Sequence, residues 1–153
     1  MFRTLALSAA LTLAAAAPLA AQVPVLDIRA GAQLAMPTGD LKNGFESGYG
    51  FYGRVGVPMA AFKMMGAVTW TRFSASGAGA DTDFFTIQAG PHMSLVPLVD
   101  IGLEVAYITE GEEFGISPSV NIGFSKLELT ASYTTTFKSP ASNWLTVGLG
   151  LRF

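Results

Sequence analysis

The sequence has no cysteine and few charged residues. Without cysteine, no disulfide can staple the fold, and no lipid can be attached through a lipoprotein cysteine. Charged residues make up 13% of the chain, against about 25% in soluble globular domains. The formal net charge is −2, so the chain lacks the basic balance typical of proteins that bind nucleic acid. We therefore expect neither a disulfide-rich domain nor a nucleic-acid partner.

Long hydrophobic runs are also missing beyond the N-terminal region. The mean hydropathy is +0.43, yet no later segment reaches the roughly 18 unbroken apolar residues that a membrane-spanning helix needs. The apolar residues must therefore be spread along the chain. The 17 glycines, together with many Thr, Val and Phe residues, suit strands and tight packing better than helices.

The first 21 residues have the pattern of a secretory signal peptide. Arg3 supplies a positive charge, residues 5–17 form an Ala-rich apolar run, and small residues precede Gln22. A membrane anchor is disfavoured because the run is short and is closed by Pro18. We expect a signal peptide at 1–21, removed by cleavage after Ala21, and one domain at 22–153.

The last nine residues alternate with a period of two. Small or polar residues separate the apolar ones, so a strand here has one apolar face. This ending resembles the C-terminal signal that the barrel-assembly machinery reads in outer-membrane proteins. The residues of this C-terminal assembly signal are Leu145, Val147, Leu149, Leu151 and Phe153.

Seven earlier segments alternate in the same way. Each is close to the 9–11 residues with which a tilted strand crosses a bilayer. The connectors alternate between longer polar stretches and tight turns, which is typical of outer-membrane barrels, and eight strands give the even number that such barrels have. The segments are 25–36, 48–58, 62–73, 84–95, 99–108, 115–124 and 127–137.

Alternation by itself leaves open which face points outward, because a lipocalin-like soluble barrel would bury the apolar face. The second face is mostly Gly, Ser and Thr, a poor soluble surface. The apolar face carries more large side chains than a narrow eight-stranded interior holds. We expect lipid outside, with interfacial girdles formed by aromatic residues near the strand ends: Tyr49, Phe51, Trp70, Phe73, Phe84, Phe85, Tyr107, Phe114, Phe124, Phe137, Trp144 and Phe153.

The first hairpin (37–58) and the final strand (145–153) resemble the small outer-membrane β-barrel family, which includes the barrel portion of OmpA and the OmpX-like proteins. The resemblance implies an all-β fold, a closed antiparallel eight-stranded transmembrane β-barrel in the outer membrane of a Gram-negative-type bacterium. The chain stops where the barrel stops, so the peptidoglycan-binding domain of full-length OmpA is not expected.

The face opposite the apolar one carries four acidic and four basic residues. An isolated charge in a low-dielectric lumen is costly, so opposite charges should pair. We predict a lumen charge network that fills and registers the barrel, with Arg152 opposite Asp27 where the last strand closes on the first. A gated ion or proton path is the alternative. The residues of the network are Asp27, Arg29, Arg54, Lys63, Asp100, Glu104, Glu128 and Arg152.

His92 is the one histidine, and Ser94 and Glu104 share its face. A His-Ser-Glu set can perform acyl transfer, and the pattern distantly resembles a lipid A deacylase barrel. We expect His92 to be a polar lumen residue instead, because its parity points it away from lipid and it lies toward the tight turn at Pro97, on the side opposite lipid A.

The longer connectors are acidic, and carboxylates there could bind a divalent cation that bridges lipopolysaccharide phosphates. Their spacing matches no EF-hand, so a solvated acidic rim is expected, with no metal site and no cofactor. The residues are Asp40, Glu46, Asp81, Asp83, Glu110, Glu112 and Glu113.

The pattern as a whole favours a monomeric, non-enzymatic protein with a structural or surface-interaction role and a plugged lumen. Its expected partners are outer-membrane lipid, lipopolysaccharide and the assembly machinery. The alternatives are a narrow pore for small solutes and a lipid-modifying barrel enzyme.

Overall fold

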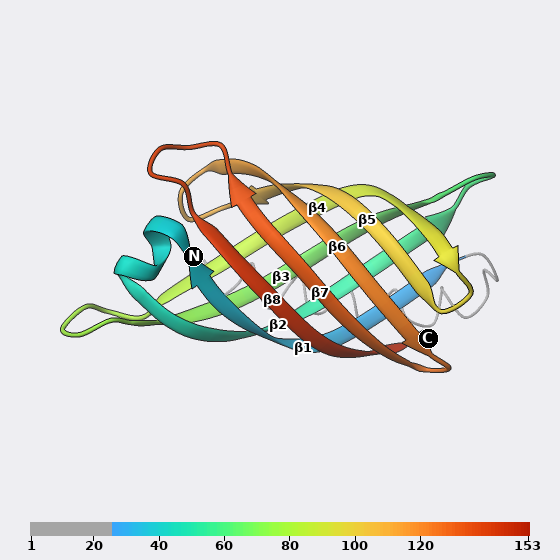
Figure 1. Cartoon of the computed structure of the whole chain (residues 1–153), viewed down its shortest axis with the longest axis horizontal. Helices are drawn as coiled ribbons and strands as arrows, with labels where there is room; N and C mark the ends of the chain where they lie inside the picture. Colours follow the sequence, from blue (N-terminus) through green and yellow to red (C-terminus); the bar gives the residue numbers. More distant parts are fainter. Residues whose placement is uncertain (1–25) are drawn as a thin grey trace, which may run out of the picture.

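The computed structural model describes residues 26–153 and forms one closed barrel of eight strands. Figure 1 shows the strands tilted together around a common axis, with the hairpin connections at its two ends. The expected signal peptide at 1–21 lies outside the described residues. The strands are β1 (Asp27–Thr38), β2 (Phe45–Pro58), β3 (Lys63–Ala75), β4 (Thr82–Val96), β5 (Val99–Ile108), β6 (Glu113–Phe124), β7 (Leu127–Thr136) and β8 (Asn143–Arg152).

Every strand pairs antiparallel with its neighbour in sequence, and β8 pairs antiparallel with β1 to close the sheet. Closure leaves no strand edge with unpaired backbone groups, which is the condition for a sheet surrounded by lipid. The predicted fold class, a closed antiparallel eight-stranded barrel, is confirmed. Within the described residues, no helix is long and apolar enough to span a membrane.

Four strands begin earlier than the sequence predicted. β2 starts at Phe45 rather than at 48, β4 at Thr82 rather than at 84, β6 at Glu113 rather than at 115, and β8 at Asn143 rather than at 145. A register shift between Phe45 and Gly48 allows β2 to pair with β3 on both sides of the polar residues that lie between these two positions. The connector after β1 is accordingly short, and most of it is the 3₁₀ helix η1 (Gly39–Asn43). We call the end of the barrel that carries η1 the loop end, and the opposite end the turn end.

Alternation along each strand separates an apolar outer face from a polar inner face, as predicted. On β8, for example, Leu149 is 57% exposed, whereas Thr146 is 4% exposed. The exposed large apolar residues come from all eight strands. The molecule therefore has the inside-out polarity of a sheet whose outer solvent is hydrocarbon.

Three aromatic residues that we assigned to the interfacial girdles lie inside the barrel instead. Phe73, Phe84 and Trp144 have the parity of lumen positions and are 0%, 9% and 3% exposed. Their ring centroids lie 5.3 Å (Phe73–Phe84) and 5.7 Å (Phe84–Trp144) apart, and Phe45 packs against them. The prediction was wrong because proximity to a strand end was given more weight than parity, which decides the side of the sheet. We call these four residues the aromatic layer.

Candidate functional site: the polar lumen

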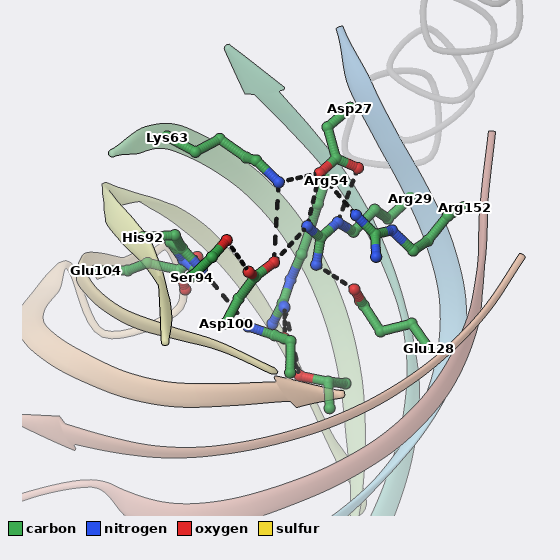
Figure 2. A network of polar contacts seen from close by, with 12 residues as sticks. Asp27, Arg29, Arg54, Lys63, His92, Ser94, Asp100, Glu104, Glu128 and Arg152 are labelled. Atoms are coloured by element: carbon green, nitrogen blue, oxygen red, sulfur yellow. Dashed lines mark hydrogen bonds and ion pairs between the residues drawn. The ribbon is translucent and has the colours of Figure 1, made fainter. Parts of the chain in front are cut away.

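The lumen changes character from one end to the other. The aromatic layer lies at the loop end, hydroxyl and amide side chains line the middle, and charged residues gather toward the turn end. All eight residues of the predicted charge network point into the lumen; Figure 2 shows them converging from different strands. The lumen, where the hydroxyl, amide and charged side chains gather, is therefore the candidate functional site.

Arg29 of β1 is the centre of the charged region and is 1% exposed. Its guanidinium binds Asp27 through two hydrogen bonds, from Nε to Oδ1 (2.9 Å) and from Nη2 to Oδ2 (2.6 Å). It also contacts Asp100 of β5 at 3.1 Å from Nη2 to Oδ2, and Glu128 of β7 through Nη1. One planar fork therefore joins three carboxylates from three strands, a task for which arginine geometry is suited.

Two further cations complete this group. Lys63 of β3 contacts Asp27 and lies 3.8 Å from Asp100, and Arg152 of β8 lies 3.4 Å from Asp27. We call these six residues the turn-end cluster: Asp27, Arg29, Lys63, Asp100, Glu128 and Arg152. Its three cations balance its three anions, which offsets the cost of placing the charges away from water.

The position of Arg152 differs from the one predicted. The register of the closing ladder places Arg152 opposite Arg29 rather than opposite Asp27. Arg152 reaches Asp27 diagonally along the ladder, and this is its one contact with a carboxylate in the described chain. Parity gave the correct face, but the register of a closing ladder depends on the tilt of the whole barrel.

Arg54 and Glu104 lie outside the turn-end cluster. The Nη1 of Arg54 donates to the Oδ1 of Asn121 at 2.7 Å and to the Oγ1 of Thr130 at 3.3 Å. Glu104 pairs with His92, whose other ring nitrogen lies 3.5 Å from the amide of Asn121. Asn121 thus links the two groups. The sequence reasoning missed Asn121 and Thr130 as partners, although both share the parity of the predicted network.

The geometry of His92 does not form the acyl-transfer relay considered above. Among the described residues, its ring nitrogens contact Glu104 and Asn121, whereas Ser94 donates its hydroxyl to Asp100 at 2.6 Å. A nucleophilic serine needs its base within hydrogen-bond reach. His92 is 2% exposed and occupies the lumen position expected for it.

Glycines on the lumen side make room for a large side chain at the seam between β1 and β8. A Cβ atom at Gly31 or Gly150 would collide with the Tyr52 ring or its hydroxyl. Tyr52 of β2 therefore lies across the closing ladder, and the Arg54 guanidinium stacks over its ring at 5.0 Å. The small residues of the seam and the aromatic ring that covers them form one packing unit.

The middle of the lumen holds a cavity of about 10 Å³, enough for one water-sized particle. It is lined by Arg54 and by hydroxyl and amide side chains, among them Gln33 and Thr86. Buried lumen atoms without a protein partner include Arg54 Nε, Glu104 Oε2 and Glu128 Oε1. Polar atoms of this kind are normally satisfied by ordered water, so we expect isolated waters at these sites.

The acidic residues of the longer connectors do not converge. Among the described residues, no three acidic or histidine side chains are placed so that together they could hold a metal ion. Asp83 instead pairs with Arg72, Asp81 accepts from the backbone of Ala75, and Glu110 accepts from the backbone of Phe85. These carboxylates stabilise strand ends.

The apolar residues of the expected C-terminal assembly signal lie on the outer face of β8. Leu149 and Leu151 are 57% and 47% exposed, and the backbone N–H of Phe153 donates to the carbonyl of Ile28 at 2.9 Å. The end of the chain is therefore tied to β1, and its apolar side chains face outward.

Comparison with known proteins shows what this fold resembles. No family model matches the sequence, and no curated protein matches it. Among solved structures, the outer-membrane protein Ail of Yersinia pestis superposes with a TM-score of 0.56 at 16% identity, over 84% of this chain and 99% of Ail. The chain has the fold of the small outer-membrane β-barrels. The N-terminal β-barrel domain of Pseudomonas aeruginosa OprF superposes with a TM-score of 0.53 at 14% identity, over 83% of this chain and 97% of that domain. A de novo designed transmembrane β-barrel gives 0.55 at 11% identity, over 83% and 95%.

Proposed function

We propose that this protein is an outer-membrane β-barrel with a structural or surface-interaction role and no enzymatic activity. The observation that carries the proposal is the apolar outer face, to which all eight strands contribute, around a polar lumen. Large residues such as Leu34 (64%), Leu103 (52%) and Phe51 (59%) would be exposed to water if the barrel were soluble. In a bilayer the same residues face hydrocarbon, where they belong.

Cell fractionation combined with gel electrophoresis before and after boiling tests this location. A folded outer-membrane barrel is expected in the outer-membrane fraction and should migrate anomalously until it is boiled. Recovery of the protein in the soluble periplasmic wash, with one mobility under both conditions, would contradict the proposal.

We further propose that the lumen is closed to solutes. The aromatic layer at the loop end and the turn-end cluster at the other end support this proposal, because side chains from opposite walls meet in both places. Planar-bilayer recordings should show no steady open channel, and liposomes carrying the protein should not swell in small sugars. Steady conductance or swelling would favour the narrow-pore alternative.

The loops make a polyanionic partner unfavourable. One structure of Ail was determined in complex with the heparin analogue sucrose octasulfate. In this chain, the loop-end residues include Asp40, Glu110 and Glu112, and the loop cations are few, Lys42 and Lys138. Like charges repel at this surface. A heparin column run at low salt should therefore not retain the folded protein, in contrast to a basic barrel.

Export and assembly complete the proposal. Cleavage after Ala21 predicts a mature N-terminus at Gln22, which intact-mass measurement of the membrane-extracted protein checks directly. The apolar outer face of β8 is proposed as the contact for the assembly machinery. Replacing Phe153 by alanine should lower the yield of inserted barrel, while the matched change of Phe137 in the loop-end connector should not.

A further inference from the structure

One charged pair interrupts the apolar outer face. Apart from Glu46 in the irregular start of β2, Arg72 and Asp83 are the charged residues at outward positions of the described strands. They lie directly opposite each other in the β3–β4 ladder at the loop end. Two hydrogen bonds join them, Nε to Oδ1 at 2.7 Å and Nη2 to Oδ2 at 3.0 Å, and both side chains are about two-fifths exposed.

An aromatic platform lies beside this pair. The Arg72 guanidinium sits 5.9 Å from the centre of the Trp70 ring. Trp70 in turn stacks on Phe51 at 6.0 Å and meets Tyr49 edge-on at 5.9 Å. Tyrosine and tryptophan rings prefer the headgroup level of a bilayer, where a charge costs little. The five residues therefore belong at the interface between hydrocarbon and headgroups.

The guanidinium keeps donors for a second acceptor. Asp83 engages Nε and Nη2, whereas arginine carries five N–H donors in a planar fork that matches phosphate. Arg72 is also the one arginine of the described chain at the loop end, because Arg29, Arg54 and Arg152 point into the lumen nearer the turn end. Among the described residues, Arg72 is therefore the one arginine that could bind a phosphate group at the outer rim of the loop end.

An apolar groove continues from the aromatic platform across the outer face. It has a volume of about 330 Å³ and runs over β1, where Ala32 is small, between Phe51 of β2 and Leu149 of β8. Tyr49 and Phe51 line the groove and also contact Trp70. A headgroup site and an acyl-chain groove therefore share two aromatic side chains.

We propose that Arg72 and Asp83 bind the phosphorylated sugar headgroup of an outer-leaflet lipid, with one acyl chain lying in the groove over β1. Arg72 donates to the phosphate, and Asp83 accepts from a hydroxyl or amide group of the sugar. The inference rests on the proposed outer-membrane location. It gives the lipopolysaccharide expected as a partner from the sequence a specific place on the barrel.

The acidic charge of the loop end distinguishes binding at Arg72 from a general electrostatic attraction of anionic lipid. The loop end carries seven carboxylates against Arg72, Lys42 and Lys138 among the residues of its loops and rim, so diffuse electrostatics repel an anionic lipid. Binding must then depend on Arg72 itself. Removing the loop cation Lys42 removes the same charge at the same end without touching the site.

The test uses the full protein purified from membranes and placed in phosphatidylcholine nanodiscs. Trp144→Phe leaves Trp70 as the single tryptophan, so its fluorescence reports on the site. The probes are a diglucosamine lipid with two phosphates, the same lipid without phosphate, and inorganic phosphate. Native mass spectrometry counts the retained lipid. We expect the phosphorylated lipid to be retained and to shift Trp70 emission, and Arg72→Gln to weaken binding about tenfold, the usual effect of losing a charge-assisted hydrogen bond.

Lys42→Gln should leave lipid binding unchanged, and Asp83→Asn should lower the preference for the sugar headgroup over a simple phosphate lipid. Equal retention by Arg72→Gln and the parent protein would overturn the proposal, as would an equal loss in Lys42→Gln. Binding of inorganic phosphate as tight as that of the lipid would also overturn it, because the groove would then contribute nothing. Heat-modifiability is measured first. A folded barrel that shows no lipid preference would contradict the lipid site alone. A chain that does not fold in nanodiscs would contradict the proposed outer-membrane function as well.

Discussion

His92 and Glu104 form a buried pair across the β4–β5 ladder, with 2.8 Å between His92 Nε2 and Glu104 Oε1. They are 2% and 0% exposed. The residue opposite His92 in the ladder is Gly102, and a Cβ at Gly102 would collide with the imidazole. The glycine therefore lets the ring lie across the ladder and reach the carboxylate two residues further along β5.

Breaking this pair should destabilise the barrel more than removing both partners. His92→Leu leaves the Glu104 carboxylate buried without its partner, so the free energy of unfolding should fall by about 3 kcal/mol. The double variant His92→Leu, Glu104→Leu should lose less than His92→Leu alone, and clearly less than the sum of the two single changes. Urea unfolding in lipid vesicles measures all four proteins. Additive losses would show that the two side chains are not coupled.

Arg29 should be the most sensitive cation of the lumen. Arg29→Met removes the partner of Asp27, Asp100 and Glu128 together. We expect a loss of about 3–5 kcal/mol in the free energy of unfolding, or failure to insert. Arg152→Met is the matched control, because Arg152 is 31% exposed and has one longer contact; it should cost about 1 kcal/mol or less. Similar losses in both variants would contradict a network centred on Arg29.

The seam between β1 and β8 should not tolerate added volume on its lumen side. Gly150→Val would collide with the Tyr52 hydroxyl and should lower stability by about 1–3 kcal/mol. Gly66→Val is the control, since a Cβ at this outward-facing position meets nothing within 4 Å. Tyr52→Phe in the Gly150→Val background should recover part of the loss. The urea midpoint and the fraction that is heat-modifiable report the result.

The fluorescence of the two tryptophans should differ in how strongly brominated lipid quenches it. Trp70 lies on the outer face, whereas Trp144 is 3% exposed within the aromatic layer. In vesicles of brominated phospholipid, the fluorescence of Trp70 in the Trp144→Phe variant should be strongly quenched. The fluorescence of Trp144 in the Trp70→Phe variant should be nearly unchanged. Strong quenching of Trp144 would show that this residue faces lipid in the outer girdle, and it would contradict an aromatic layer inside the lumen.

Strand number, face and location in the barrel follow from local pattern. Hydrophobic alternation repeats every two residues, so the residues of each segment are enough to predict which of its side chains face lipid. The same parity places Arg54 and Glu128 in the lumen, and it would also have placed Phe73 and Trp144 there. Strand ends were less predictable, because the bulge in β2 extends pairing into polar residues that read as loop.

The alternating pattern is thus sufficient to predict an eight-stranded barrel with an apolar exterior and a set of inward charges. Which of these charges meet depends on how the closed barrel packs. Arg29 of β1 contacts Asp100 of β5 and Glu128 of β7, positions far apart in the chain. The physical reason is closure: a sheet curled on itself brings long side chains from opposite walls within reach of one another, at heights set by strand tilt and register rather than by any local residue pattern.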